Sequence, residues 1–144
     1  MASFKDIALD APVYVNFIIP ENAGAVDAAL FTSDGYYEVL EAREVHTVAG
    51  TDGSAVTLDL LKAASGTAFG SGTSVLASTF NLKSTAATPV SKTITNGGVV
   101  QTRSSRLVNI GDTLYANFAG TLTGYVGGVV TVALKRDQRR PRVR

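Results

Sequence analysis

Apolar and polar residues alternate along several short stretches of this chain, a pattern typical of half-buried β-strands. Val13, Val15 and Phe17 fall in phase between two prolines. Residues 56–60 and 129–134 alternate in the same way, with an apolar side chain at every second position. The alternation predicts a chain that is built mainly of β-strands.

Turn sequences separate these stretches at intervals of about 8 to 15 residues. Their Asp-Gly and Asn-Gly pairs supply the positive φ angles that tight turns need. About seven or eight short strands at this spacing predict an all-β fold, an antiparallel β-sandwich. The turn sequences are SDG (33–35), GTDGS (50–54), TNGG (95–98) and NIGD (109–112).

Two segments fit neither the strand period nor the helix period cleanly. Residues 36–48 are rich in helix-forming Glu, Leu, Ala and Arg, yet they lie between two turn sequences. We interpret them as one long strand with a β-bulge, and a helix remains the alternative. Residues 66–89 begin as a loop of small residues, and Leu76 and Phe80 would share a face in a strand and in a helix alike. The second segment therefore stays open.

Residues 113–134 carry no charge, and basic residues follow them. The length of this uncharged segment and the basic residues after it are typical of a membrane span. The same segment contains Asn117, four glycines and four threonines. It splits into two alternating runs around a glycine-rich turn. A β-hairpin therefore fits the pattern better than a membrane span, and we expect no membrane association.

Charge is distributed unevenly along the chain. Six of the 13 Lys and Arg residues and one of the 12 acidic residues lie in 135–144, so this segment carries +5 and the other 134 residues carry −4. The chain lacks cysteine, which excludes a disulfide framework, thiolate chemistry and a zinc ribbon. Charged residues stand where a secretory signal would need an apolar core, so we expect no export signal.

Length and composition predict one folded domain with an arm at each end. We expect an N-terminal arm over residues 1–11, the β-sandwich domain over 12–136 and a basic C-terminal arm over 137–144. Pro141 excludes a continuing strand at a hydrogen-bonded position, so the basic arm should leave the sheet. The arm could bind nucleic acid, remain solvated, or dock on carboxylates of an acidic partner or a neighbouring copy. The acidic body disfavours nucleic acid.

Candidate catalytic residues are few. His46 has Glu44 on the same strand face, but catalysis would also need a nucleophile nearby, and the pattern favours a polar residue at the surface or an interface. Glu38, Glu41 and Glu44 favour a solvated charged stripe over a metal or acid–base site. Residues 66–72 are glycine-rich but lack the Lys-Ser/Thr ending of a phosphate loop. We expect neither enzymatic activity, nor a small-molecule substrate, nor a cofactor.

Three segments of the chain resemble small structural proteins of tailed bacteriophages. They are YYEVLEAREVHTVAGTDGSAVTLDLLK, GTSVLASTFNLKSTAATPVSKTI and RLVNIGDTLYANFAGTLTGYVGGVVTVALKR. The most specific elements are EVHTVAGTDG, the NIGDTL turn and the closing VVTVALKR. The resemblance spans about Val13 to Arg136, and the family comprises decoration (cement) and head-associated proteins.

The resemblance implies a jelly-roll-like sandwich on the capsid exterior, commonly as trimers that tie neighbouring subunits together. The partners would be the major capsid protein and further copies of this chain, and the location would be the surface of a virion assembled in the host cytoplasm. We predict that both arms make the reaching contacts. Alternative functions are a head-fibre base, a tail or receptor-recognition module, or a nucleic-acid-binding β-barrel. The candidate contact residues are Phe4, Lys5, Arg136, Arg139, Arg140, Arg142 and Arg144.

Overall fold

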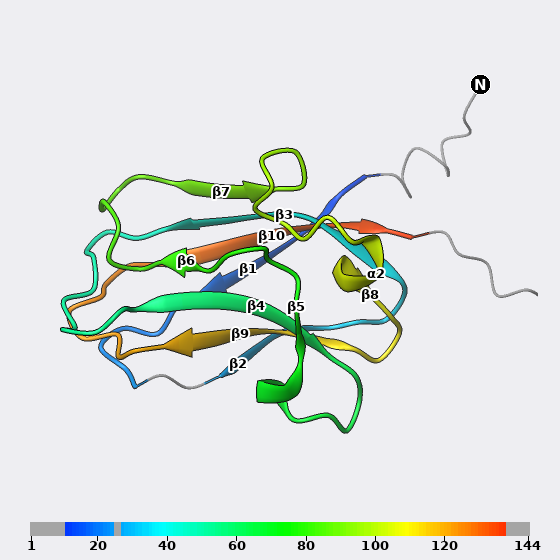
Figure 1. Cartoon of the computed structure of the whole chain (residues 1–144), viewed down its shortest axis with the longest axis horizontal. Helices are drawn as coiled ribbons and strands as arrows, with labels where there is room; N and C mark the ends of the chain where they lie inside the picture. Colours follow the sequence, from blue (N-terminus) through cyan, green and yellow to red (C-terminus); the bar gives the residue numbers. More distant parts are fainter. Residues whose placement is uncertain (1–10, 25–26, 138–144) are drawn as a thin grey trace, which may run out of the picture.

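The computed structural model describes residues 11–24 and 27–137, which form two antiparallel sheets packed face to face (Figure 1). The sheet that we call sheet A has the strand order β1-β10-β3-β7, with β8 also paired to β3. Its strands are β1 (Val13–Ile18), β10 (Val129–Arg136), β3 (Tyr37–Val45), β7 (Val90–Thr93) and β8 (Leu107–Val108). This arrangement confirms the predicted all-β sandwich.

The other sheet, sheet B, has the order β2-β9-β4-β5, with β6 also paired to β4. Its strands are β2 (Ala28–Thr32), β9 (Thr113–Ala119), β4 (Thr57–Ala63), β5 (Thr73–Ser74) and β6 (Phe80–Asn81). Two single turns, the 3-10 helix η1 (Phe69–Ser71) and α2 (Arg103–Arg106), connect strands. Within the described residues, no helix is long and apolar enough to span a membrane.

The strand pairing has the nested order of a jelly roll. The first strand pairs with the last, β2 pairs with β9, β3 pairs with β7 and β8, and β4 pairs with β5 and β6. These are the pairings of one long antiparallel hairpin. The hairpin is then folded over so that β10 also meets β3 and β9 also meets β4. The jelly-roll expectation is therefore confirmed.

Alternating residues of the two sheets fill the core between them. Val130, Val132 and Leu134 of β10 are fully buried, as are Leu58 and Leu60 of β4. These are the apolar positions that the period-2 pattern places on one face of each strand. The burial of this apolar surface is the main source of stability of the sandwich.

Within the segment 36–48, β3 (Tyr37–Val45) forms one long strand with a bulge, as expected. In the pairing of β3 with β10, Val39 faces Leu134 and Glu41 faces Ala133, so Leu40 is the extra residue. A bulge residue reverses the alternation that follows it. Tyr37 and Val39 point inward before the bulge, and Ala42 points inward after it. This reversal explains why neither period fitted the segment.

The expected hairpin over 113–134 is wrong. Strand β9 belongs to sheet B and β10 to sheet A, so residues 120–128 cross from one sheet to the other. This crossover buries Leu122 and Tyr125 in the core, and Val126 forms a bridge with Val48. The segment 66–89, which the pattern left open, contains only η1 and the two-residue strands β5 and β6.

A carboxylate joins the crossover to the loop before β4. One oxygen of Asp52 accepts hydrogen bonds from the Thr121 amide at 2.9 Å and from the Ser54 hydroxyl at 2.7 Å. The Thr121 amide, followed by the Ser54 hydroxyl, lowers the pKa of Asp52 below its ordinary value of 3.8. Folding therefore favours the ionised carboxylate, which stabilises the protein above pH 3.8 and loses this effect as the pH falls further.

We expect the difference in unfolding free energy between the unchanged protein and the variant Asp52→Asn to depend on pH in this way. Asn has nearly the shape of Asp but carries no charge at any pH. The variant should be less stable at neutral pH, and the difference should shrink as the pH falls below 3.8. Urea unfolding at a series of pH values measures it. A difference that stays constant across the acidic range would contradict this role of the carboxylate.

Candidate functional site

Both predicted arms begin at the same end of sheet A. Strand β1 starts at Val13, which pairs with Leu134 near the end of the neighbouring strand β10. Figure 1 shows the start of β1 and the end of β10 at the same end of the molecule. Among the candidate contact residues, only Arg136 lies within the described part of the chain. The others, which lie outside it, are Phe4, Lys5, Arg139, Arg140, Arg142 and Arg144.

Arg136 is half exposed and binds within its own domain. Its Nη2 donates a hydrogen bond of 3.0 Å to the Tyr37 hydroxyl, and the guanidinium lies 5.5 Å from the centre of the Tyr37 ring. The same nitrogen lies 3.8 Å from Asp34 Oδ2. The Tyr37 hydroxyl donates to Asp34, which lowers the pKa of that carboxyl, and the charge of Arg136 lowers it further. Part of Arg136 is therefore committed to the fold.

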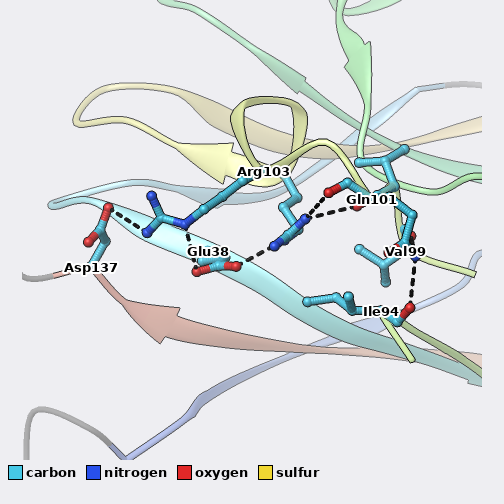
Figure 2. A network of polar contacts seen from close by, with 8 residues as sticks. Glu38, Ile94, Val99, Gln101, Arg103 and Asp137 are labelled. Atoms are coloured by element: carbon cyan, nitrogen blue, oxygen red, sulfur yellow. Dashed lines mark hydrogen bonds and ion pairs between the residues drawn. The ribbon is translucent and has the colours of Figure 1, made fainter. Parts of the chain in front are cut away.

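A second network, the Glu38 cluster, holds the point where the basic arm begins (Figure 2). It consists of Glu38 on β3, Arg103 and Arg106 on α2, and Asp137 after β10. Arg106 Nε lies 2.9 Å from Glu38 Oε1, and Arg103 Nε lies 3.5 Å from Glu38 Oε2. Arg103 Nη2 also reaches Asp137 Oδ2 at 3.5 Å. Glu38 thus joins two arginines, one of which extends to the first residue of the arm.

Main-chain contacts complete the attachment at both sides of the cluster. The Asp137 amide donates to the Tyr36 carbonyl at 2.7 Å, and Arg106 Nη1 donates to the carbonyls of Val100 and Gln101 at 3.2 and 2.6 Å. Asp137 is therefore fixed through its main chain and its side chain. Arg103 and Arg106 were not among the residues predicted from the sequence. The available signal was RSSR (103–106), two arginines in a stretch that otherwise has no charge.

The two arginines of the Glu38 cluster should differ in their effect on stability. Arg106 has a side chain that is 11% exposed and three hydrogen-bond acceptors, so Arg106→Ala should lower the free energy of unfolding by about 1.5–3 kcal/mol. Arg103 is 53% exposed and solvent screens its ion pairs, so Arg103→Ala should lower it by less than about 1 kcal/mol. Urea unfolding of the two variants provides the measurement. Equal losses would contradict this assignment.

Glu44, His46 and Tyr125 form a buried polar cluster on the inner face of sheet A. His46 Nδ1 lies 2.8 Å from Glu44 Oε1, and the Tyr125 hydroxyl donates to the same oxygen at 2.8 Å. His46 Nε2 lies 3.0 Å from the Ser84 carbonyl oxygen. A carbonyl oxygen only accepts hydrogen bonds, so His46 Nε2 must carry a proton. A second proton is then needed between Nδ1 and Glu44 Oε1, either on the ring or on the carboxyl group, because two acceptors cannot form a hydrogen bond. Burial and the Glu44 carboxylate raise the pKa of Tyr125.

The cluster corrects two expectations from the sequence. His46 was expected at the surface or an interface and is 1% exposed, and Glu44 was expected in a solvated stripe and is also 1% exposed. Both face the core because the bulge at Leu40 sets the phase of the strand after it. Glu44 Oε1 is paired with His46 and Tyr125, whereas Glu44 Oε2 is buried without a hydrogen-bond partner. The side chains of Glu44 and His46 have no exposed surface.

The described residues contain no group of three or more His, Asp or Glu side chains placed to hold a metal ion. The three glutamates of β3, Glu38, Glu41 and Glu44, do not form one site. Glu44 points inward, whereas Glu41 lines the outer face of the sheet. Glu38 is engaged with the two arginines of its cluster.

No protein-family model matches this chain, and no curated protein matches it. A chain in the structure of the Gx strain of infectious bursal disease virus is similar in fold, with a TM-score of 0.35 and 14% sequence identity. The alignment covers 90% of this chain, which spans 38% of the length of the viral chain. A likeness this distant carries no argument about function.

Proposed function

We propose that this chain is a virion structural protein that binds the outside of a bacteriophage capsid and cements neighbouring major capsid subunits. One observation carries the proposal. The two segments predicted to reach a partner begin on neighbouring strands at one end of the sandwich, where Val13 pairs with Leu134. A body with both arms at one end can attach to a surface through that end. The resemblance to phage decoration proteins supplies the kind of surface.

The attachment of the basic arm also supports the proposal. Asp137 is held by Arg103 and by the main chain of Tyr36, the residue before β3, so the arm starts from a fixed position. A fixed starting point reduces the conformational entropy that is lost when the arm docks. Arg139, Arg140, Arg142 and Arg144 would pair with carboxylates of the capsid, with Arg136 contributing its exposed part.

We further propose that the protein acts as a homotrimer. One arm supplies only a few charged contacts, whereas three arms on one body bind with a high effective concentration after the first has docked. Trimers would match the local three-fold positions of a capsid lattice, where three neighbouring subunits meet. Each trimer would then join capsid subunits that are otherwise held together only by their own contacts.

A truncated chain that ends at Asp137 tests the proposal. The truncation removes residues 138–144 and keeps the ion pair with Arg103. The test compares the co-sedimentation of both chains with shells assembled from the major capsid protein of the same virus. We expect the truncation to weaken binding by about tenfold or more, because the arm supplies charge-assisted contacts. Replacing the four arginines at 139, 140, 142 and 144 by Gln, at full length, should have the same effect.

Light scattering provides the control, because both chains should keep the mass of a trimer. Undiminished binding of the truncated chain to the shells would contradict the role of the arm. Tail-dependent DNA binding at physiological salt, together with no binding to shells, would favour the nucleic-acid alternative instead.

A further inference from the structure

The outer face of sheet A carries rows of side chains that run across three strands. Reading from β1 through β10 to β3, the rows are Tyr14–Ala133–Glu41, Asn16–Thr131–Arg43 and Ile18–Val129–Val45. The first two rows combine an aromatic ring with polar and charged groups, and the third row is apolar. None of these side chains belongs to the Glu38 cluster or to the buried Glu44 cluster.

The first two rows enclose a groove of about 220 Å³. The small residues Ala133 and Thr131 of the central strand form its floor, Tyr14 forms one wall, and Glu41 and Arg43 form the other. Although Ala133 points outward, it is only 6% exposed because the walls cover it, whereas Tyr14 is 63% exposed. The groove is therefore a shaped recess in the sheet, with an accessible aromatic side chain at its edge.

The polar groups of the groove are held in place by one another. Arg43 Nε lies 2.5 Å from Glu41 Oε1, and the Thr131 hydroxyl donates to Asn16 Oδ1 at 2.7 Å. Arg43 keeps further N–H donors, and Glu41 keeps a second acceptor oxygen. The charges of Arg43 and Glu41 cancel, so the groove presents donors and acceptors without a net charge.

These properties restrict the chemistry of a ligand. An extended peptide cannot add to the groove as a strand, because it lies on a sheet face whose main-chain groups pair with neighbouring strands. An anion would meet the carboxylate of Glu41, and a cation would meet the guanidinium of Arg43. The groove is smaller than the ~300–1,000 Å³ of most small-molecule sites, so it suits a single ring.

We propose that this groove binds one ring of a neutral glycan. A sugar ring has an apolar face of C–H groups, which would pack on the Tyr14 ring. Its rim has hydroxyls that both donate and accept. Adjacent hydroxyls would pair with the free N–H groups of Arg43 and the free oxygen of Glu41. This activity would be additional to capsid binding.

Nuclear magnetic resonance with the full-length chain tests the proposal. The probes are a panel of neutral trisaccharides of hexoses and N-acetylhexosamines at millimolar concentration. At least one should receive saturation transfer from the protein and shift the amide signals of Thr131 and Ala133. Tyr14→Ala should weaken its binding by about tenfold, which is about 1.4 kcal/mol. Tyr14→Phe keeps the ring and should bind nearly as well as the unchanged chain.

Glu41→Gln and Arg43→Ala should also weaken binding, since each removes part of the wall that meets the hydroxyls. The control Ile110→Ala changes an exposed apolar residue outside the groove and should leave binding unchanged. Added salt should have little effect, because the ligand is uncharged. The proposal is overturned if no trisaccharide shifts the groove signals, if Tyr14→Ala binds as well as the unchanged chain, or if binding falls steeply with salt.

Discussion

Glu44→Ala is expected to lower the free energy of unfolding by about 2–6 kcal/mol, because it leaves two buried polar groups without their shared partner, at a cost of about 1–3 kcal/mol each. Glu44 Oε1 is the acceptor for both His46 and the Tyr125 hydroxyl. Without it, a ring nitrogen and a hydroxyl inside the core lose their partner, and each carries an unpaid desolvation cost. The measurement is the urea midpoint together with the slope of the transition.

Glu41→Ala is the matched control, since Glu41 lies on the same strand but faces outward and pairs with the exposed Arg43. It should cost less than about 1 kcal/mol. A double variant, Glu44→Leu with His46→Leu, should recover much of the loss, because apolar residues leave fewer buried groups unpaired. Equal losses for Glu44→Ala and Glu41→Ala would show that the buried cluster contributes no more to stability than the exposed pair of Glu41 and Arg43.

Gly120→Ala is the second substitution with a large expected effect. Gly120 follows β9 with a φ of +76°, and a Cβ atom there would collide with the carbonyl oxygen of Ala55. The left-handed backbone costs an alanine about 1–2 kcal/mol, and the collision adds about 1–3 kcal/mol because the obstacle is main chain. We therefore expect a loss of about 2–5 kcal/mol in thermal or urea unfolding.

Gly66→Ala separates the two causes of that loss. Gly66 has a similar φ of +82°, but nothing lies within 4 Å of the position of its Cβ. It should show only the backbone cost, about 1–2 kcal/mol. If both alanine variants lose the same stability, the close contact between residue 120 and Ala55 makes no contribution.

Much of the fold could be predicted from the alternation of apolar residues. Val130, Val132 and Leu134 identify the buried face of their strand because each apolar side chain is two residues from the next. The same pattern does not say which sheet a strand joins. Residues 113–119 and 129–136 look like two strands of a hairpin, but the buried side chains of Leu122 and Tyr125 make the intervening segment a crossover. That information lies in tertiary packing.

The polar interior was harder to predict than the apolar interior. His46 and Glu44 were placed on one strand face correctly, but polar residues are usually exposed, so that face was assigned to the surface. Only the bulge at Leu40 and the contact with Tyr125, 81 residues away from Glu44, place both residues in the core. Similarly, Arg103 and Arg106 gain their role from Glu38, which is distant in sequence and adjacent in space.

The most direct test of the central proposal is whether the intact protein binds closed capsid shells from the outside. Fluorescently labelled protein would be added to preformed shells of the major capsid protein of the same virus, and the bound fraction measured by sedimentation. We predict saturable binding that weakens with salt, as expected for an arm that carries arginines. Protein that remains folded but stays in the supernatant at all concentrations would contradict the proposed cement function.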